Sequence, residues 1–202
     1  MKIEILVEGR TESAFKPVLL DFLRHRLPGS MSRLHFTRYD GRIPKEEKLR
    51  RVVENLLSGS DPVDAVIALT DVYTGTADFA DAQDAKSKMQ QWVGAVSNFF
   101  PHVALHDFEA WLLPYWGDIV RLAGHNLKAP GACPEKVNHN KPPAHRLQEL
   151  FEAGRTRKSY NKPRDALRIL KGKDLSIAAN ACPELKLFLN RIIGLAGGKP
   201  LP

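Results

Sequence analysis

The segment from Lys2 to Phe15, KIEILVEGRTESAF, constrains the fold more than any other part of the chain. Its first half is a short apolar run, which is typical of a buried parallel strand. Glu8 and Gly9 end that run, and Thr11 suits the N-cap of a following helix. A buried strand that turns directly into a helix predicts an open α/β sheet, in which ligands bind beyond the carboxyl ends of the strands.

Glu8 and Glu12 lie four positions apart across this turn, so both carboxylates can reach the same small volume. Two carboxylates that close repel each other unless a cation or a proton lies between them. One interpretation is a site for Mg²⁺ or Mn²⁺, which prefer oxygen ligands. The alternative is structural, with Glu8 as a turn residue and Glu12 as an acid favoured by the dipole of the first helical turn.

Composition limits the class of protein. The chain has 202 residues, 43% of them hydrophobic and 26% charged, which is an ordinary globular balance. We expect an α/β core over residues 1–123 with an extension over 124–202, or a single domain over 1–202. No apolar run approaches the roughly 18 residues of a membrane span, and the first residues form a strand rather than a signal peptide. We therefore expect a cytoplasmic protein without a membrane segment, in which Cys133 and Cys182 are reduced thiols.

The distribution of charge is uneven. The net charge is +7, yet the first 100 residues hold 14 basic and 14 acidic side chains, whereas residues 101–202 hold 16 and 9. Between Lys136 and Lys173 there are 11 basic residues and three acidic ones. An acidic N-terminal site beside a basic extension suits a metal-dependent enzyme that acts on a polyanion. An ordinary solvated basic surface is the alternative.

Apolar runs and helical periodicity alternate along the core. The expected strands lie at 3–7, 34–39, 65–69 and 103–105, and the expected helices at about 12–26, 45–57 and 80–99. This order predicts a mainly parallel sheet of about four strands flanked by helices. The extension is expected to hold a long loop over 124–143 and helices near 143–151, 164–170 and 185–195.

Acidic residues follow three of these strands. Asp71 comes directly after the third strand, and Asp107 and Glu109 come after the fourth. With Glu8 and Glu12, they form three acidic clusters at the carboxyl edge of one sheet. Such an edge can hold one or two divalent metals, which position a phosphate and activate a water.

Several ordered motifs resemble a known family. They are the strand followed by Glu-Gly-x-Thr-Glu, the later Thr-Asp-x-Tyr at 70–73, and HDFEAW at 106–111. The tail adds KPPAHR at 141–146, YNK at 160–162 and ACPEL at 181–185. Together they resemble the TOPRIM-like proteins of unknown function in prokaryotic defence and mobile-element operons, which are relatives of the OLD-family nucleases. The order of the motifs carries the resemblance, and residues 3–113 hold most of it.

The resemblance implies a TOPRIM-type core with Mg²⁺- or Mn²⁺-dependent phosphodiester chemistry. Glu8 matches the TOPRIM glutamate, a metal ligand or general acid/base, and Glu12 matches the second glutamate of the opening motif. Asp71 matches the first aspartate of the family's Asp-x-Asp motif. The second aspartate is missing, because Tyr73 stands there. That ligand would have to come from Asp78, Asp107 or Glu109.

The resemblance also implies roles for the tail. Lys141 and Lys162 match positions that serve a phosphate, like the lysine of OLD nucleases, and either of them could fill the role. A partner ATPase is implied as well, because relatives are often encoded beside one.

Other residues of the tail are candidates for binding nucleic acid directly. They are Arg155, Arg157, Lys158, Tyr160 and Lys162. Tyr160 lies among basic residues, so it could stack on a base, or it could belong to an ordinary exposed loop. Five histidines between 102 and 145 raise zinc as an alternative ligand chemistry, but they show no metal-binding spacing.

These observations favour a divalent-metal-dependent nuclease that acts on DNA or RNA. The resemblance makes it the effector subunit of a prokaryotic anti-phage defence system. The alternative is a non-catalytic subunit that binds nucleic acid or an ATPase and keeps a structural metal. Another TOPRIM reaction, such as nucleotidyl transfer, is a third possibility. The sequence leaves open DNA or RNA and the oligomeric state.

Overall fold

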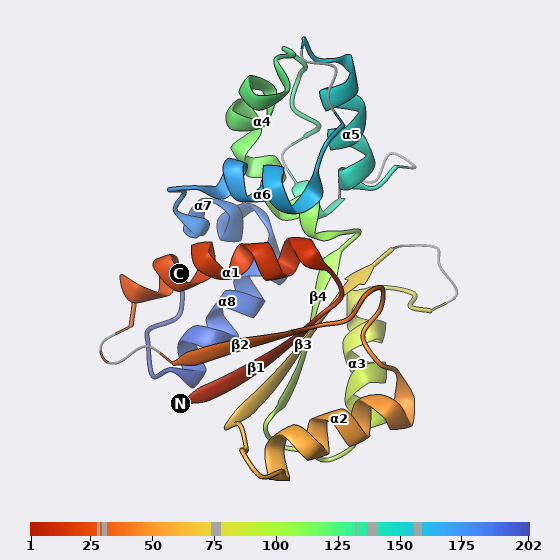
Figure 1. Ribbon diagram of the computed structural model, residues 1–202, viewed down its shortest axis with the longest axis vertical. Helices are drawn as coiled ribbons and strands as arrows, with labels where there is room; N and C mark the ends of the chain where they lie inside the picture. The colour runs from red at the N-terminus through yellow and green to blue at the C-terminus, as the bar shows by residue number, and fades with distance from the viewer. Residues whose placement is uncertain (28, 30–31, 74–77, 132, 137–140, 156–158) are drawn as a thin grey trace.

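The computed structural model describes residues 1–202 except 28, 30–31, 74–77, 132, 137–140 and 156–158. Its sheet has four strands: β1 (Lys2–Val7), β2 (Arg33–Arg38), β3 (Ala65–Val72) and β4 (Phe99–Leu105). The strand order is β2-β1-β3-β4, and every neighbouring pair is parallel. The structure therefore confirms the predicted parallel sheet of about four strands flanked by helices (Figure 1).

Helices cover both faces of the sheet (Figure 1). Those of the core are α1 (Arg10–Arg24), α2 (Glu46–Ser58) and α3 (Ala82–Val93). Those that follow β4 are the 3₁₀ helix η1 (Phe108–Tyr115), α4 (Trp116–Ala123), the 3₁₀ turn η2 (Pro134–Lys136), α5 (Pro143–Ala153), α6 (Lys162–Leu170), α7 (Leu175–Ala181) and α8 (Pro183–Leu195). Side chains alternate across each strand, so Ile3 and Ile5 pack toward α1 and α8, whereas Leu6 packs toward α2 and α3.

The extension shares the core of the sheet. Phe188 and Ile192 of α8 belong to the same apolar cluster as Ile3 and Ile5 of β1. Residues from η1, α4, α5, α6 and α7 join that cluster. One continuous core therefore crosses the predicted boundary at residue 123.

The region around β4 differs from the prediction. The helix expected over 80–99 ends at Val93, because Gly94 adopts a positive φ of 83° and stops it. β4 then begins at Phe99, four residues before the predicted start, and contains Pro101. The carbonyl of Asn98 and the N–H of His106 bond to β3. Backbone groups alternate in direction along a strand, so the even-numbered positions face β3 and the nitrogen of Pro101 faces the outer edge. A proline there removes no ladder bond, which is why an edge strand tolerates it.

Other local expectations also changed. α1 begins at Arg10 with Gly9 as its N-cap, so Thr11 is not the cap as predicted. Neither α4 nor α7 was predicted, and these helices are only eight and seven residues long. Within the described residues, Cys133 and Cys182 are free thiols, and no helix combines the length and apolar character that crossing a membrane requires.

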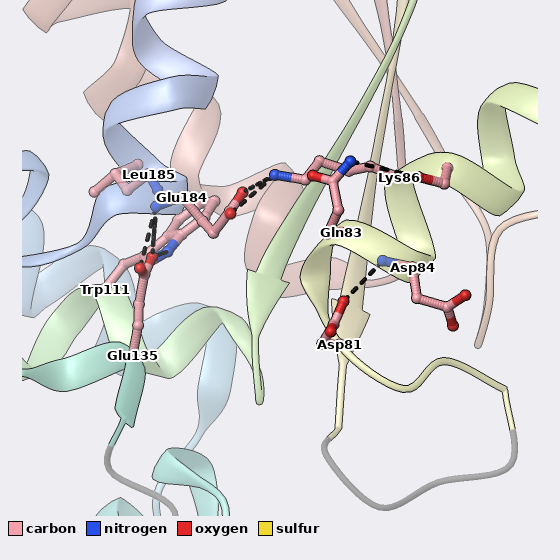
Figure 2. Close-up of polar contacts among 9 residues, drawn as sticks. Asp81, Gln83, Asp84, Lys86, Trp111, Glu135, Glu184 and Leu185 are labelled. Atoms are coloured by element: carbon pink, nitrogen blue, oxygen red, sulfur yellow. Dashed lines mark hydrogen bonds and ion pairs between the residues drawn. The ribbon is translucent and has the colours of Figure 1, made fainter.

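A buried carboxylate anchors η2, a described part of the segment that was expected to be a long loop. Glu135 of η2 accepts hydrogen bonds from the backbone N–H groups of Glu184, at 3.1 Å, and Leu185, at 3.3 Å (Figure 2). It also accepts one from the indole of Trp111 at 3.2 Å. Glu135 therefore caps the N-terminus of α8 from a distant part of the chain. Beside it, Lys86 of α3 pairs with Glu184 at 2.9 Å and links α3 to α8 (Figure 2).

Replacing Glu135 by Ala is expected to lower the free energy of unfolding by about 2–3 kcal/mol, because buried N–H donors lose their acceptor. Urea titration followed by circular dichroism measures the change. Glu149→Ala is the matched control, since that carboxylate is exposed and pairs with the exposed side chains of Lys141 and His145; its loss of stability should be much smaller than that of Glu135→Ala. Equal losses in the two variants would contradict the anchoring role.

Candidate metal and phosphate site

The carboxyl ends of β1 and β3 bring the first two acidic clusters together. These strands are parallel neighbours in register, with Val7 opposite Leu69. Glu8 directly follows β1, and Asp71 lies one residue before the end of β3. The hydroxyl of Thr70 donates a hydrogen bond to Glu8 Oε1, so the side chain of Glu8 is held over the end of β3.

A pocket of about 410 Å³ opens at this edge of the sheet. We call it the acid pocket. Its lining residues come from the β1–α1 turn, β3, the loop after β2, η1 and the start of α6: Glu8, Gly9, Arg10, Thr11, Glu12, Gly41, Asp71, Tyr73, Phe108, Glu109, Lys162 and Pro163. The structure thus brings Glu8, Glu12, Asp71, Glu109 and, of the two candidate lysines, Lys162 to one pocket.

Gly9 allows the two glutamates of the opening motif to face the same pocket. A Cβ atom at this position would lie 3.0 Å from Glu12 Oε2, which is tighter than ordinary side-chain contacts. Glu12 itself is buried, with 6% of its surface exposed. A side chain at position 9 would therefore press on the carboxylate of Glu12, which would have to shift by a few tenths of an ångström.

Asp107 lies behind the acid pocket and does not line it. Its side chain is fully buried, and Oδ2 accepts a hydrogen bond from the backbone N–H of Ala144 at 3.0 Å, in the first turn of α5. Its other oxygen, Oδ1, is buried without a hydrogen-bond partner among the described residues. The predicted direct ligand Asp107 thus supports the pocket from the second layer and ties η1 to α5.

Glu109 is held from two directions. The hydroxyl of Tyr160 lies 3.5 Å from its Oε1, and Lys162 Nζ lies 3.6 Å from its Oε2. Tyr160 is only 7% exposed, and its ring packs on Phe151 with a centroid distance of 5.3 Å. The predicted base-stacking role of Tyr160 is therefore wrong for this structure, because the ring faces the interior.

The pKa values show how strongly these acids affect one another. Burial raises the pKa of Asp71 well above its usual value, and the charges of Glu12, Glu8, Asp107 and Glu109 raise it further. Burial likewise raises the pKa of Glu8 to about 7, and it raises the pKa values of Glu12, Asp107 and Glu109. Asp71 is thus at the centre of the negative charge.

Lys162 is the counter-charge of this group. Burial alone would lower its pKa, but Glu109, Asp107, Asp71 and Glu12 together raise it above the ordinary value. The side chain remains 48% exposed, so its ammonium lies at the mouth of the acid pocket rather than inside the core. A cation in this place can contact both the acids and an incoming anion.

The donor set fits a hard divalent cation, because every acid of the pocket offers carboxylate oxygens. In the part of the chain that the structure describes, however, no three His, Cys, Asp or Glu side chains are arranged so that they would hold a metal ion. In this arrangement Glu8 is held by Thr70, and Glu109 by Tyr160 and Lys162. A metal would have to draw these side chains away from their present partners.

Several predicted residues lie elsewhere. Lys141 is exposed and pairs with Glu149, and Asp78 pairs with Arg42 and Lys45 instead of facing the acids. Arg155 is exposed beside the end of α4, where its backbone N–H donates to the carbonyl of Gly124 at 3.3 Å. Arg157 and Lys158 lie outside the described residues.

The histidines are dispersed. His102 lies in β4 with its ring centroid 5.7 Å from that of Phe188, and His106 directly follows the same strand with a φ of 70°. His125 follows α4, and His145 lies in the first turn of α5. His139 lies outside the described residues.

Some pocket residues were not named as site residues from the sequence. Tyr73 lines the pocket, and Thr70 holds Glu8 from outside the lining; both belong to the Thr-Asp-x-Tyr motif, so the motif itself was the available signal. Arg10 follows the opening Glu-Gly pair and lines the pocket from the first residue of α1. Gly41 comes from the loop after β2, and no pattern in the sequence pointed to it.

Comparison with known proteins places the chain in a family. Residues 7–193 match the model of a family described as a domain of unknown function, DUF4276. The chain belongs to this family. No match to this DUF4276 protein was found among curated proteins. Among solved structures it is similar to the C-terminal region of the Burkholderia pseudomallei OLD protein, with 13% sequence identity and a TM-score of 0.47, over 89% of this chain and 97% of that one.

Proposed function

We propose that this DUF4276 protein is a divalent-metal-dependent nuclease that hydrolyses phosphodiester bonds in DNA or RNA. One observation carries the proposal. Asp71 feels the negative charge of Glu8, Glu12, Asp107 and Glu109 at the same time, in a pocket at the carboxyl edge of a parallel sheet. Such a concentration of carboxylates is costly for the protein without cations, and the site lies where α/β sheets bind ligands.

The proposed cofactor is Mg²⁺ or Mn²⁺, held by Glu8, Glu12, Asp71 and Glu109, with Asp107 in support. When bound, such a cation polarises a phosphodiester and makes a water more acidic. The chain's own residues then have distinct tasks. Lys162 at the mouth of the pocket offsets charge on the phosphate, Thr70 orients Glu8, and Tyr160 orients Glu109 from within the core.

The resemblance of the motifs also supports a proposal for the biological role of the protein. It supports an effector subunit of an anti-phage defence system in a prokaryotic cytoplasm, working with an ATPase partner. The excess of positive charge in residues 101–202 supports a polyanionic substrate, because neutralising phosphates favours association.

A non-catalytic regulatory subunit is the second candidate. It is favoured by the missing second aspartate of the family's Asp-x-Asp motif and by the involvement of Asp78 in other ion pairs. In that case the acids would keep a structural cation, and the basic surface would bind nucleic acid or an ATPase.

The decisive experiment is cleavage of plasmid DNA and of a mixed RNA pool with Mn²⁺, by the full chain and by Glu8→Gln. We expect parent activity that requires the metal and falls at least 100-fold in Glu8→Gln, because an amide is a poor ligand and cannot act as an acid or base. Thermal melts must show that the variant is folded. Activity that persists unchanged in Glu8→Gln would overturn the proposed site, whereas Mn²⁺ binding without any cleavage would favour the regulatory subunit.

A further inference from the structure

Two basic side chains beside the acid pocket share one carboxylate. Arg42, in the loop after β2, has its Nη1 atom 2.7 Å from Asp78 Oδ2. Lys45, at the N-cap of α2, has its Nζ atom 2.7 Å from Asp78 Oδ1. Lys88 of α3 fixes the same residue from another side by donating to its backbone carbonyl at 3.1 Å. We call Arg42, Lys45 and Asp78 the loop cluster.

The loop cluster adjoins the acid pocket. The backbone N–H of Gly41 donates to the carbonyl of Glu8 at 3.3 Å, and Gly41 itself lines the pocket. Arg42 is the next residue. Burial raises the pKa of Glu8, and the positive charge of Arg42 partly opposes that rise, so the guanidinium lies near the Glu8 carboxyl. The loop cluster therefore begins at the residue that follows the pocket lining, on the side of Glu8.

The loop cluster is open to solvent. The side chains of Arg42, Lys45 and Asp78 are 36%, 40% and 34% exposed. The ion pair between Lys86 and Glu184, by contrast, has side chains only 19% and 11% exposed and lies between α3 and α8. Exposed pairs contribute little stability, so the contacts of Asp78 can be exchanged for contacts with another anion at small cost.

Arg42 and Lys45 are placed around the Asp78 carboxylate as two cations would be placed around a phosphate. Each oxygen of Asp78 contacts a different cation, as the two non-bridging oxygens of a phosphodiester would. Two cations share one negative charge, so the cluster keeps an excess of positive charge. The guanidinium of an Arg makes directional hydrogen bonds, and the ammonium of a Lys acts as a point charge. Both groups commonly bind phosphate.

We propose that Arg42 and Lys45 form a phosphate-binding subsite for the nucleic-acid backbone next to the cleavage position, and that Asp78 takes the place of the phosphate when no nucleic acid is bound. This inference rests on the proposed function, because it places a neighbouring phosphate of the same substrate. The subsite needs no metal. It lies beside Glu8, and Lys162 serves the acid pocket from α6, so the substrate would meet cations from two separate elements.

The test measures binding of a fluorescent single-stranded oligonucleotide to the full chain by anisotropy, in EDTA so that cleavage does not interfere. The dissociation constant is measured over a series of KCl concentrations for the parent, for Arg42→Ala/Lys45→Ala and for Arg50→Ala/Arg51→Ala. The second double variant is the matched control. It also removes two positive charges, from the exposed surface of α2, where both side chains pair with Glu47.

We expect Arg42→Ala/Lys45→Ala to weaken binding by about 10-fold and to reduce the slope of log affinity against log salt by about 0.7, which corresponds to one phosphate on a single strand. The control should keep the parent slope. Asp78→Asn should tighten binding, because it removes the competing anion while keeping the size of the side chain. Should the double variant melt well below the parent, Arg42→Gln and Lys45→Gln are tested singly.

Equal effects of the two double variants would overturn the subsite, because only net charge would then matter. Weaker binding by Asp78→Asn would also overturn it, since Asp78 would then be a positioning residue for the loop rather than a substitute for phosphate. The failure of the subsite and the failure of the proposed function remain distinguishable. If Arg42→Ala/Lys45→Ala binds more weakly than the control but no variant shows Mn²⁺-dependent cleavage, the subsite stands and the nuclease function fails. If the parent cleaves but Arg42→Ala/Lys45→Ala binds as tightly as the parent, the nuclease function stands and the subsite fails.

Discussion

Replacing Asp71 by Asn is expected to raise the free energy of unfolding of the metal-free protein at pH 8 by about 1–3 kcal/mol. Most polar substitutions at partly buried positions destabilise, so the opposite sign is informative. The expectation follows from the position of Asp71, which burial and four neighbouring carboxylates disfavour as an anion. An amide has no charge, so it feels neither effect, and it relieves the same repulsion on Glu8 and Glu12.

The pH dependence should reveal the cause. The pKa of Glu8 is raised from 4.5 to about 7, and those of Glu12, Asp71 and Glu109 are raised as well. Between about pH 4.5 and 7 the folded protein therefore holds protons that the unfolded chain has released, so stability falls as the pH rises. The shift of Glu8 alone accounts for at most about 3 kcal/mol of that fall. Asp71→Asn should make the dependence shallower.

Urea titrations in EDTA at pH 5, 6, 7 and 8 measure this effect for the parent and the variant. Asp61→Asn is the control, because Asp61 is exposed and the contact with Lys2 lowers its pKa. Its stabilising effect is therefore complete above its ordinary pKa, and its removal should leave the slope between pH 5 and 8 unchanged. Millimolar Mn²⁺ should stabilise the parent by mass action and stabilise Asp71→Asn much less, since a ligand is lost. A variant that is less stable than the parent at every pH would show that Asp71 is a structural residue.

The gathering of acids at one edge of the sheet could be predicted from the sequence because it follows from sheet topology and not from any particular distance. Alternation of apolar runs and helices indicated a parallel sheet, and the carboxyl ends of parallel strands meet at one edge. Glu8 and Asp71 follow that rule directly, and Glu109 is brought back to the same edge by the turn after β4. The exact ends of the elements mattered little for this inference.

Side-chain environment was harder to predict. Tyr160 stands among basic residues, which is typical of an exposed loop, yet it is buried against Phe151 and Glu109, nine and 51 positions away. Asp107 adjoins the pocket in sequence but faces α5, where it accepts a bond from Ala144. Both outcomes depend on how α5 and α6 pack on η1, and short helices in a polar segment give no periodic signal of their partners.

The choice between Lys141 and Lys162 likewise depended on how the helices pack. Both lie in polar stretches that match the family's motifs, so the sequence left the phosphate role open between them. The structure places them differently because α6 packs against α1 and begins at Lys162, which puts its ammonium at the mouth of the acid pocket. Lys141 lies before α5 and pairs with Glu149 on the surface.

Replacing Lys162 by Ala is therefore expected to reduce Mn²⁺-dependent cleavage by about 100- to 1,000-fold, the usual cost of losing one group that stabilises developing charge. Lys141→Ala should stay within about 2-fold of the parent. Cleavage of a labelled oligonucleotide under single-turnover conditions measures both variants. Lys162→Arg is the conservative variant, and it should recover part of the rate because it keeps the positive charge.

Stability gives a second readout that does not depend on catalysis. Lys162 lowers the pKa of Glu109 against the larger effect of burial, so its removal makes ionised Glu109 still less favourable. We expect Lys162→Ala to destabilise the metal-free protein more at pH 8 than at pH 5, where Glu109 is protonated in any case. Lys141→Ala should show no such dependence. If Lys141→Ala instead abolished cleavage while Lys162→Ala retained it, the phosphate would have to enter near the start of α5, and the acid pocket would not be the catalytic site.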